Sequence, residues 1–346
     1  MGGVLKMKFS AIFAIALSAC AVAGPALAAD CAPLKLLSTL KMEPMEGGLD
    51  DVRTVPVDVN DQTKKFLLDT GGALSQISRK AADDLKLDIL DSGGFELYDV
   101  NGNMTRKTAT VEKFRVGRML FTKVRLPVST FGGNAFDGIL SSNMLVNYDI
   151  DLDFPGNTMN YVSPDHCKGA VLYWKADQVG VVPITLVDNT RITVKVTLEG
   201  QSFDAFIDTG ATHSVMSDRV AKYFFHVPLA APGDRPIEKI NGDPTLTGYL
   251  HTFSKLSFGG VEIDKPQIMI LEDRVNRGGD RSQQTGNRAL ANNADITLPK
   301  LVIGMNMLSD LHVYMSFAER RVYVTKGKPP NVTQDAAPAA AAGTAP

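Results

Sequence analysis

Two aspartates stand out as residues that could do chemistry, because each begins an Asp-Thr-Gly tripeptide that follows an apolar run. The two copies are Asp69-Thr70-Gly71 and Asp208-Thr209-Gly210. A given tripeptide is expected on the order of 0.1 times in a chain of this length and ordinary composition. A single copy is most simply a turn, since Asp bonds neighbouring amides and Gly accepts positive φ. Two copies in the same setting instead predict one site built from both aspartates.

Paired carboxyl groups are suited to the hydrolysis of a peptide bond. That reaction needs a base to deprotonate water and an acid to protonate first the carbonyl oxygen and then the leaving amine. Two carboxyl groups about 3 Å apart cannot both ionise readily, so one keeps its proton while the other is charged. The pair titrates as a unit, and the sequence does not assign the proton to Asp69 or to Asp208. This chemistry requires no cofactor, no metal and no covalent intermediate.

The tripeptides lie inside a longer internal repeat. Asp208 follows Asp69 by 139 positions (208 minus 69), and the shift grows to 163 (306 minus 143) farther along the chain. The matched segments are Ser75–Ser78 with Ser214–Ser217, and Asn143–Leu145 with Asn306–Leu308. The growth of the shift locates an insertion at the polar segment 274–297, which we expect to form a long loop.

Alternating side chains predict an all-β protein. Residues 54–59 and 192–197 alternate apolar with polar types, which is typical of half-buried strands. We divide the chain into a first lobe at 31–164, a connector at 165–176, a second lobe at 177–326, and an Ala/Pro-rich tail at 327–346 that we expect to be disordered.

Helix signals are few and short. Ser78 is the expected N-cap of a helix over 79–85, and Ser217 is its counterpart before 218–223. Asn143 and Asn306 are expected to open the two remaining helices.

These residues resemble the aspartic peptidases of the pepsin and retropepsin type, in particular bacterial proteins with two fused retropepsin-like repeats. The resemblance covers most of residues 50–325 and includes the later apolar-apolar-Gly segment that ends at Gly304. It implies a two-lobed, pepsin-like architecture in which each lobe is a closed barrel, with Asp69 and Asp208 as the catalytic dyad. It also implies that Thr70 and Thr209 cross-link the two loops through their hydroxyl groups.

The glycines of the tripeptides have an expected role of their own. Gly71 and Gly210 let the backbone turn beside the carboxylate and point amide donors at it, which a Cβ would obstruct. The first lobe departs from the family pattern, because Ser141 stands where Gly304 stands in the second lobe. This glycine lets a strand pass close behind the catalytic loop, so Ser141 must either fit there or shift the lobe.

A flap over the substrate is expected in the first lobe. Asn101 and Gly102 are expected to form a hairpin turn where the family has this lid. Tyr98, just before the turn, is a candidate substrate contact, and the alternative is a tyrosine packed within its strand.

The start of the chain reads as an export signal. Residues 1–28 combine Lys6 and Lys8 with an apolar run and a small-residue cleavage site, which predicts a signal peptide and a periplasmic or secreted bacterial protein. Cys20 closes a segment that looks like a lipoprotein box, so a lipid anchor is the alternative. Cys31 and Cys167 would remain after cleavage, and an oxidising compartment favours a disulfide between them over two free thiols.

Other classes find little support. The formal charge of −2 comes with no basic stripe, which argues against nucleic-acid binding. The five histidines have no zinc-ligand spacing. Gly72 and Ala211, which follow the tripeptides, carry no hydroxyl, whereas pepsin-like enzymes of strong acid have Ser or Thr there. A dyad without that hydrogen bond keeps its proton to higher pH, so we expect an optimum in mildly acidic to neutral conditions.

The sequence thus predicts an exported, monomeric aspartic endopeptidase that acts on a peptide or protein substrate. The alternative is a non-catalytic peptide-binding or scaffold protein that keeps the two lobes. A third arrangement, in which each lobe pairs with its counterpart in another chain, would show in the solution mass.

Overall fold

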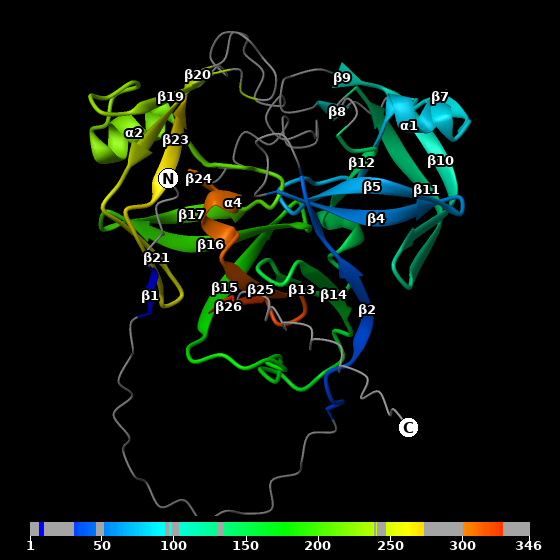
Figure 1. Ribbon diagram of the computed structural model, residues 1–346, viewed down its shortest axis with the longest axis horizontal. Coiled ribbons are helices and arrows are strands. Elements are labelled where there is room, and N and C mark those ends of the chain that lie inside the picture. The colour runs from blue at the N-terminus through cyan, green and yellow to red at the C-terminus, as the bar shows by residue number, and fades with distance from the viewer. Residues whose placement is uncertain are drawn as a thin grey trace, which may run out of the picture.

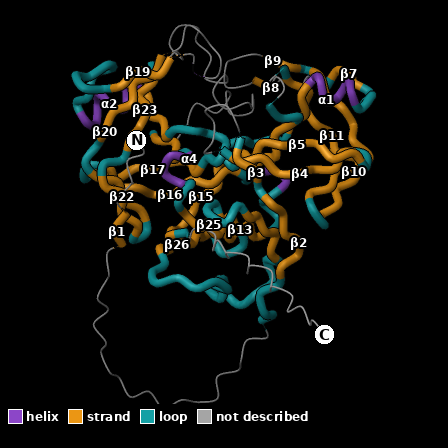
Figure 2. The backbone as a smooth tube through the Cα atoms, viewed as in Figure 1, coloured by secondary structure: helices purple, strands orange, loops and turns teal. Residues whose placement is uncertain are grey.

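The computed structural model describes residues 7–9, 31–45, 52–93, 97–98, 104–130, 135–238, 240, 247–272 and 300–327. Strands account for 54% of the structure and helices are few, so the predicted all-β class is confirmed. Figure 1 shows two strand-rich lobes side by side above a shared sheet, and Figure 2 shows how little helix they contain. The predicted insertion at 274–297, the flap turn and the tail from 328 onward lie outside the described residues, as does most of the expected signal peptide.

The first lobe is built on a closed barrel of six strands. These are β4 (Arg53–Val59), β5 (Gln62–Asp69), β6 (Gln76–Ser78), β10 (Lys107–Val116), β11 (Met119–Ser129) and β12 (Gly138–Ser141). Hydrogen bonds run in the circuit β4, β5, β12, β6, β11, β10 and back to β4. The short strands β3 (Glu43–Pro44) and β7 (Ile89–Asp91) pair at its margins.

The second lobe repeats this circuit with one change. Its strands are β16 (Arg191–Leu198), β17 (Gln201–Ile207), β18 (Ser214–Ser217), β20 (Thr247–Thr252), β21 (Lys255–Phe258), β22 (Val261–Asp264), β23 (Gln267–Leu271) and β24 (Leu301–Ile303). The long hairpin is divided into an outer pair, β20 with β23, and an inner pair, β21 with β22. Two short strands lie at the edges, β19 (Arg235–Glu238) on β20 and β1 (Met7–Phe9) on β22.

A six-stranded antiparallel sheet joins the two lobes, and the repeat alone did not predict it. Its order is β15 (Gly180–Val187), β26 (Arg321–Lys326), β25 (Leu311–Ser316), β13 (Asp149–Asp153), β14 (Thr158–Val162) and β2 (Leu36–Lys41). Each half of the chain supplies three strands. The halves meet where β13 pairs with β25, and there Asp151 stands opposite its own repeat equivalent, Tyr314. The approximate twofold relation of the lobes therefore passes through this pair.

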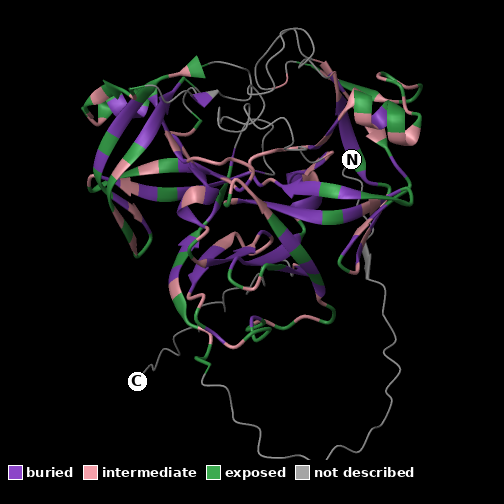
Figure 3. Ribbon diagram, turned by 180° about the vertical axis from the view of Figure 1, so that it is seen from behind, coloured by how far each residue is buried: buried purple, intermediate pink, exposed green. Residues whose placement is uncertain are grey.

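The barrel interiors are filled by the alternating apolar positions seen in the sequence. In β4, Val55, Val57 and Val59 are each at most 1% exposed, while Pro56 between them is exposed. Phe66 and Phe114 pack edge to face inside the first barrel, with ring centres 5.6 Å apart. Figure 3 shows the buried positions running along the strands of both lobes. Period-2 burial of this kind is what fixes strand register.

Two of the predicted helix starts are present. Ser78 caps α1 (Arg79–Asp84) by accepting the amide of Ala81, and Ser217 caps α2 (Asp218–Phe225) by accepting that of Val220. Among the described residues, no helix is long and apolar enough to cross a membrane.

The role expected for Asn143 and Asn306 was wrong. Asn143 lies inside a short 3₁₀ helix, Ser142–Met144, and Asn306 lies inside α4 (Met305–Leu308). The residues at the N-cap positions are Ser141 and Gly304. Both Asn side chains instead accept hydrogen bonds from the serine that follows each catalytic loop, as described below.

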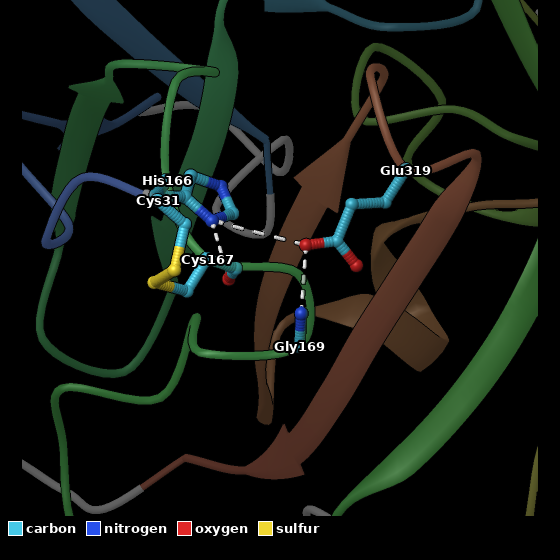
Figure 4. Close-up of a disulfide and its surroundings, with 5 residues drawn as sticks. All are labelled: Cys31, His166, Cys167, Gly169 and Glu319. Atoms are coloured by element: carbon cyan, nitrogen blue, oxygen red, sulfur yellow. Dashed lines mark hydrogen bonds and ion pairs between the residues drawn. A yellow bond between two sulfur atoms is a disulfide. The ribbon is translucent and has the colours of Figure 1, made fainter. Parts of the chain in front are cut away.

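The disulfide between Cys31 and Cys167 is present and ties the start of the first lobe to the connector. Figure 4 shows the surroundings of this bond. The His166 Nδ1 lies 3.0 Å from the Cys167 carbonyl and 3.8 Å from Glu319, which also accepts the Gly169 amide at 2.9 Å. The connector is therefore held to both halves of the chain.

The connector is fixed to the central sheet by one aspartate–histidine pair and by a tryptophan that stacks on the histidine of a second pair. Asp149 bonds His166 at 2.7 Å, and Asp151 bonds His312 at 2.5 Å. Trp174 stacks on the His312 ring with centres 3.9 Å apart. Because each of these two histidines has a carboxylate partner, neither ring has the cost of an unpaired buried polar group.

Candidate active site

The two Asp-Thr-Gly loops lie at corresponding ends of strands in the two barrels. Asp69 is the last residue of β5, and Asp208 follows directly after β17. Behind each loop passes the strand of the later repeat segment, with Ser141 of β12 opposite Asp69 and the Asp208 amide bonded to the Ile303 carbonyl at 3.0 Å. The structure thus brings together the two aspartates that the sequence marked.

Four hydrogen bonds made by Thr70 and Thr209 join the loops across the lobe boundary. The Thr70 hydroxyl donates to the Ile207 carbonyl at 2.8 Å, and the Thr209 hydroxyl donates to the Leu68 carbonyl at 2.8 Å. Each hydroxyl oxygen also accepts the amide of the other threonine, at 3.1 and 3.2 Å. Thr70 and Thr209 are both buried, so this symmetrical set holds the loops at a fixed separation.

The glycines of the tripeptides are required by the opposite lobe. A Cβ on Gly71 would overlap the carboxyl group of Asp208, and a Cβ on Gly210 would lie 2.8 Å from the Asp69 Cγ. Neither glycine has a positive φ, so space is the reason for glycine here and backbone conformation is not. The absence of two Cβ atoms is what lets the carboxyl groups approach each other.

Both carboxyl groups are partly buried and hydrogen-bonded. Asp69 Oδ1 accepts the Gly72 amide at 2.7 Å, and Asp208 Oδ1 accepts the Gly210 amide at 2.9 Å. Burial raises the pKa of both side chains above the usual range of aspartate. Beyond burial, the charge of Asp69 raises the pKa of Asp208, while the hydrogen bond from Asp208 lowers that of Asp69. A single proton shared by the two carboxyl groups is the state that these directions favour.

A serine and an asparagine support each loop, and the sequence analysis missed this role. Ser75 donates both its amide and its hydroxyl to Asn143 Oδ1, at 2.8 and 2.9 Å. Ser214 does the same to Asn306 Oδ1, at 2.7 and 2.8 Å. Both pairs were visible in the repeat, but at different shifts along the chain, and only their identical geometry shows that they act together.

Ser141 fits behind the first catalytic loop without displacing its strand. Its amide donates to the Ser75 hydroxyl at 2.9 Å, and the Gly304 amide donates to the Ser214 hydroxyl at the same 2.9 Å. A Cβ on Gly304 would lie 2.7 Å from the carbonyl oxygen of Ala211. The first lobe has room for the serine because the residue across from it is Gly72.

The expected flap is described only in part. Tyr98 belongs to β8 (Leu97–Tyr98), which pairs with β9 (Met104–Thr105). This ladder is consistent with a hairpin at that point. Asn101 and Gly102 lie outside the described residues, so their part in substrate binding stays a prediction.

Within the described ranges, no group of His, Cys, Asp and Glu side chains could hold a metal ion. Three of the histidines are bonded to single aspartates, the third pair being His251 with Asp234 at 2.6 Å. A cavity of about 350 Å³ lies in the second lobe between the end of α2 and the β20–β21 corner, lined among others by Phe225, His226 and Phe253. Neither aspartate of an Asp-Thr-Gly loop lines it.

Comparison with known families assigns both lobes. Residues 55–144 match the family model described as "Aspartyl protease". Residues 194–310 match the model described as "gag-polyprotein putative aspartyl protease". A search of curated proteins gave no match. Each match contains one Asp-Thr-Gly loop, and the chain consists of two retropepsin-like aspartyl protease domains fused in tandem.

Proposed function

We propose that this chain is an exported aspartic endopeptidase in which Asp69 and Asp208 together activate a water molecule. The observation that carries the proposal is the pair of carboxyl groups, each packed against the glycine of the opposite loop, on loops that four threonine hydrogen bonds hold at a fixed separation. A binding protein has no need for two carboxyl groups pressed together, because burying like charges costs free energy.

In the reaction, Asp69 is the base and Asp208 is the acid. Asp69 takes a proton from the water, whose oxygen attacks the carbonyl carbon of the scissile peptide. Asp208 gives its proton to the carbonyl oxygen, so the intermediate is a neutral gem-diol bound without a covalent link to the protein. Asp69 then gives its proton to the amide nitrogen as the C–N bond breaks, and Asp208 takes a proton from a hydroxyl of the gem-diol. The products are a carboxylic acid and an amine, and the dyad has again one proton.

The assignment of roles rests on the environment of the two carboxyl groups. Burial raises the pKa of both, and the neighbouring charge of Asp69 raises that of Asp208 further. An acid has to be protonated before the reaction begins and a base has to be ionised. One proton shared by the pair meets both requirements, and we assign the acid role to Asp208 and the base role to Asp69.

Export is proposed from the leader at residues 1–28 and is supported by the disulfide between Cys31 and Cys167. Disulfides persist in oxidising compartments such as the bacterial periplasm or the exterior. A monomer is proposed because the two halves of the site come from one chain.

The test is digestion of a diverse peptide library by purified mature protein, with new amino termini identified by mass spectrometry. Wild type should cleave internal peptide bonds, and Asp208→Asn should not, while circular dichroism shows the same fold for both. Peptides that bind equally well to both proteins without being cut would instead favour the non-catalytic alternative.

A further inference from the structure

One buried hydroxyl beside the dyad has no use in the arrangement described so far. Ser141 is fully buried, and its Oγ has no hydrogen-bond partner among the described residues. Leaving a buried hydroxyl unpaired costs about 1–3 kcal/mol. Ser141 is also the position where the second lobe has glycine, so the side chain itself distinguishes the lobes.

The hydroxyl faces the catalytic carboxyl group across the missing side chain of Gly72. A Cβ on Gly72 would lie 2.6 Å from Ser141 Oγ and 2.6 Å from Asp69 Oδ2. These two oxygens therefore border the same small space. The other carboxyl oxygen, Asp69 Oδ1, is the one that accepts the Gly72 amide. Oδ2 is thus the oxygen that a donor on Ser141 would serve.

The second lobe has the opposite distribution of side chains. There Ala211 carries the Cβ on the loop and Gly304 has none on the strand, and a Cβ on Gly304 would lie 2.7 Å from the Ala211 carbonyl oxygen. In each lobe one of the two facing positions is glycine. In the first lobe the side chain is that of Ser141 on the strand, and in the second it is that of Ala211 on the loop. Only Ser141 carries a hydroxyl.

We propose that Ser141 is a positioning residue whose hydroxyl donates a hydrogen bond to Oδ2 of ionised Asp69, taking the place of a hydroxyl on the loop residue Gly72. The expected change in the pH-rate profile rests on the proposed function. The expected change in the titration of Asp69 rests on the geometry alone. The proposal differs from the expectation drawn from Gly72 and Ala211 alone, in which no hydroxyl donates to the dyad.

The charged groups around Asp69 set the direction of the effect. Asp208 is its neighbour in the dyad, and the more distant Arg191, paired with Asp188, lowers the pKa of Asp69 slightly. A donor on Ser141 favours the charged form of Asp69, as Arg191 does. Both features therefore favour the charged form of Asp69.

The first experiment removes the hydroxyl with Ser141→Ala and uses Ser38→Ala as the matched control. Ser38 is also buried, but it lies in the central sheet and its hydroxyl accepts the Arg118 amide. Ser141→Ala should move the acid limb of the pH-rate profile to higher pH by about one unit, because the charged form of the dyad loses a donor. The basic limb should stay in place. An acid limb that does not move in Ser141→Ala would overturn the proposal, even if the turnover falls.

The second experiment returns the hydroxyl from the loop. Gly72→Ser alone should be less stable than wild type, because the added Cβ meets both the Ser141 hydroxyl and the Asp69 carboxyl group. Combined with Ser141→Gly it should regain the part of the stability lost to the Ser141 hydroxyl and bring the acid limb back to the wild-type pH. If the double variant has the pH-rate profile of Ser141→Ala, a hydroxyl at position 72 does not replace the one at position 141, and the proposal is contradicted.

Carboxyl titration by carbon NMR, in protein labelled at aspartate, separates this inference from the proposed function. The titration of Asp69 should move to higher pH in Ser141→Ala and remain unchanged in Ser38→Ala. If wild type cleaves no peptide, the proposed function fails while this titration still decides the role of Ser141. An unchanged titration overturns the role of Ser141 whether or not the protein is active.

Discussion

The two lobes share the barrel circuit, apart from the divided hairpin of the second, and the Asp-Thr-Gly loop, yet the surroundings of their aspartates differ. The first lobe places the Ser141 hydroxyl next to Asp69, whereas the second has Gly304 at that position and no hydroxyl. A perfect twofold repeat would give two equivalent carboxyl groups. Acid–base catalysis needs two different ones. The comparison teaches that the internal repeat brings the two aspartates together, and that the few residues that differ between the lobes give Asp69 and Asp208 different surroundings.

A second difference lies at the start of the first barrel strand. At matching positions of the repeat the first lobe has Val52 and the second has Arg191, at 2% and 4% exposed. Arg191 binds Asp188 with an N–O distance of 2.5 Å, and its guanidinium lies 4.8 Å from the ring centre of Phe206. A buried cation at this repeat position in the second lobe, where the first has a valine, is a further source of asymmetry in the field at the dyad.

The largest expected effect tests whether the dyad acts as a unit. Asp69→Asn and Asp208→Asn should each reduce kcat by at least about 10³-fold, because either change removes one member of the acid–base pair. The double variant should be no worse than either single one, since residues that act together are not additive. Steady-state kinetics on one peptide measures this. Either single variant with near-wild-type turnover would disprove the mechanism.

The next effect concerns the bond that only the first lobe has. Replacing Cys31 and Cys167 with serine should reduce the free energy of unfolding by about 4 kcal/mol, because the disulfide closes a loop spanning 136 positions of the sequence. Urea denaturation of the two proteins gives the difference. Equal midpoints and slopes for both would show that the connector is held by its aspartate–histidine pairs alone.

The pH dependence of stability tests the charge state of the dyad. A carboxyl group whose folded pKa is raised costs no stability below its unfolded pKa, and stability is lost as pH rises toward the folded pKa. Asp208 is such a group, mainly through burial. Asp208→Asn should therefore match wild type near pH 3 and exceed it at pH 7 by at least about 1 kcal/mol. Urea unfolding at several pH values checks this, and a constant difference would refute the raised pKa.

Exchanging the strand residues between lobes should have unequal costs. Gly304→Ser should lower the free energy of unfolding by about 1–3 kcal/mol, because its Cβ meets backbone carbonyl oxygens of the catalytic loop. Ser141→Gly should cost less than about 1 kcal/mol, the usual penalty of glycine in a strand. Thermal unfolding of both variants gives the comparison. Equal losses would mean that the lobes are packed alike at this point.

The smallest effect concerns the buried ion pair of the second lobe. Replacing Arg191 with methionine and Asp188 with asparagine together avoids leaving one charge unpaired. The acid limb of the pH-rate profile should move to higher pH by less than about one unit, because the charge of Arg191 lowers the pKa of Asp69 only as a minor cause. A shift to lower pH would show that Asp188 has the stronger influence.

The sequence by itself determined the all-β class, the two repeated lobes and the pairing of Cys31 with Cys167. These features could be predicted because each has a pattern that is visible along the sequence. The patterns are the alternating side chains, the repeated tripeptide and the two cysteines that remain after the leader. The caps at Ser78 and Ser217 were found for the same reason, since an N-cap bonds an amide three residues away.

Only the tertiary structure decided how distant segments complete the site. Asn143 was read as a helix opener, because the sequence does not show that β12 and the helix after it pass behind a loop some 70 residues earlier. Ser141 was recognised only as a departure from the family pattern, because its fit depends on Gly72, which lies beside it in the catalytic loop. The internal repeat also did not predict the central sheet, because that sheet forms where a strand of one half pairs with a strand of the other. Contacts between residues far apart in the chain depend on packing in three dimensions, which spacing along one dimension does not encode.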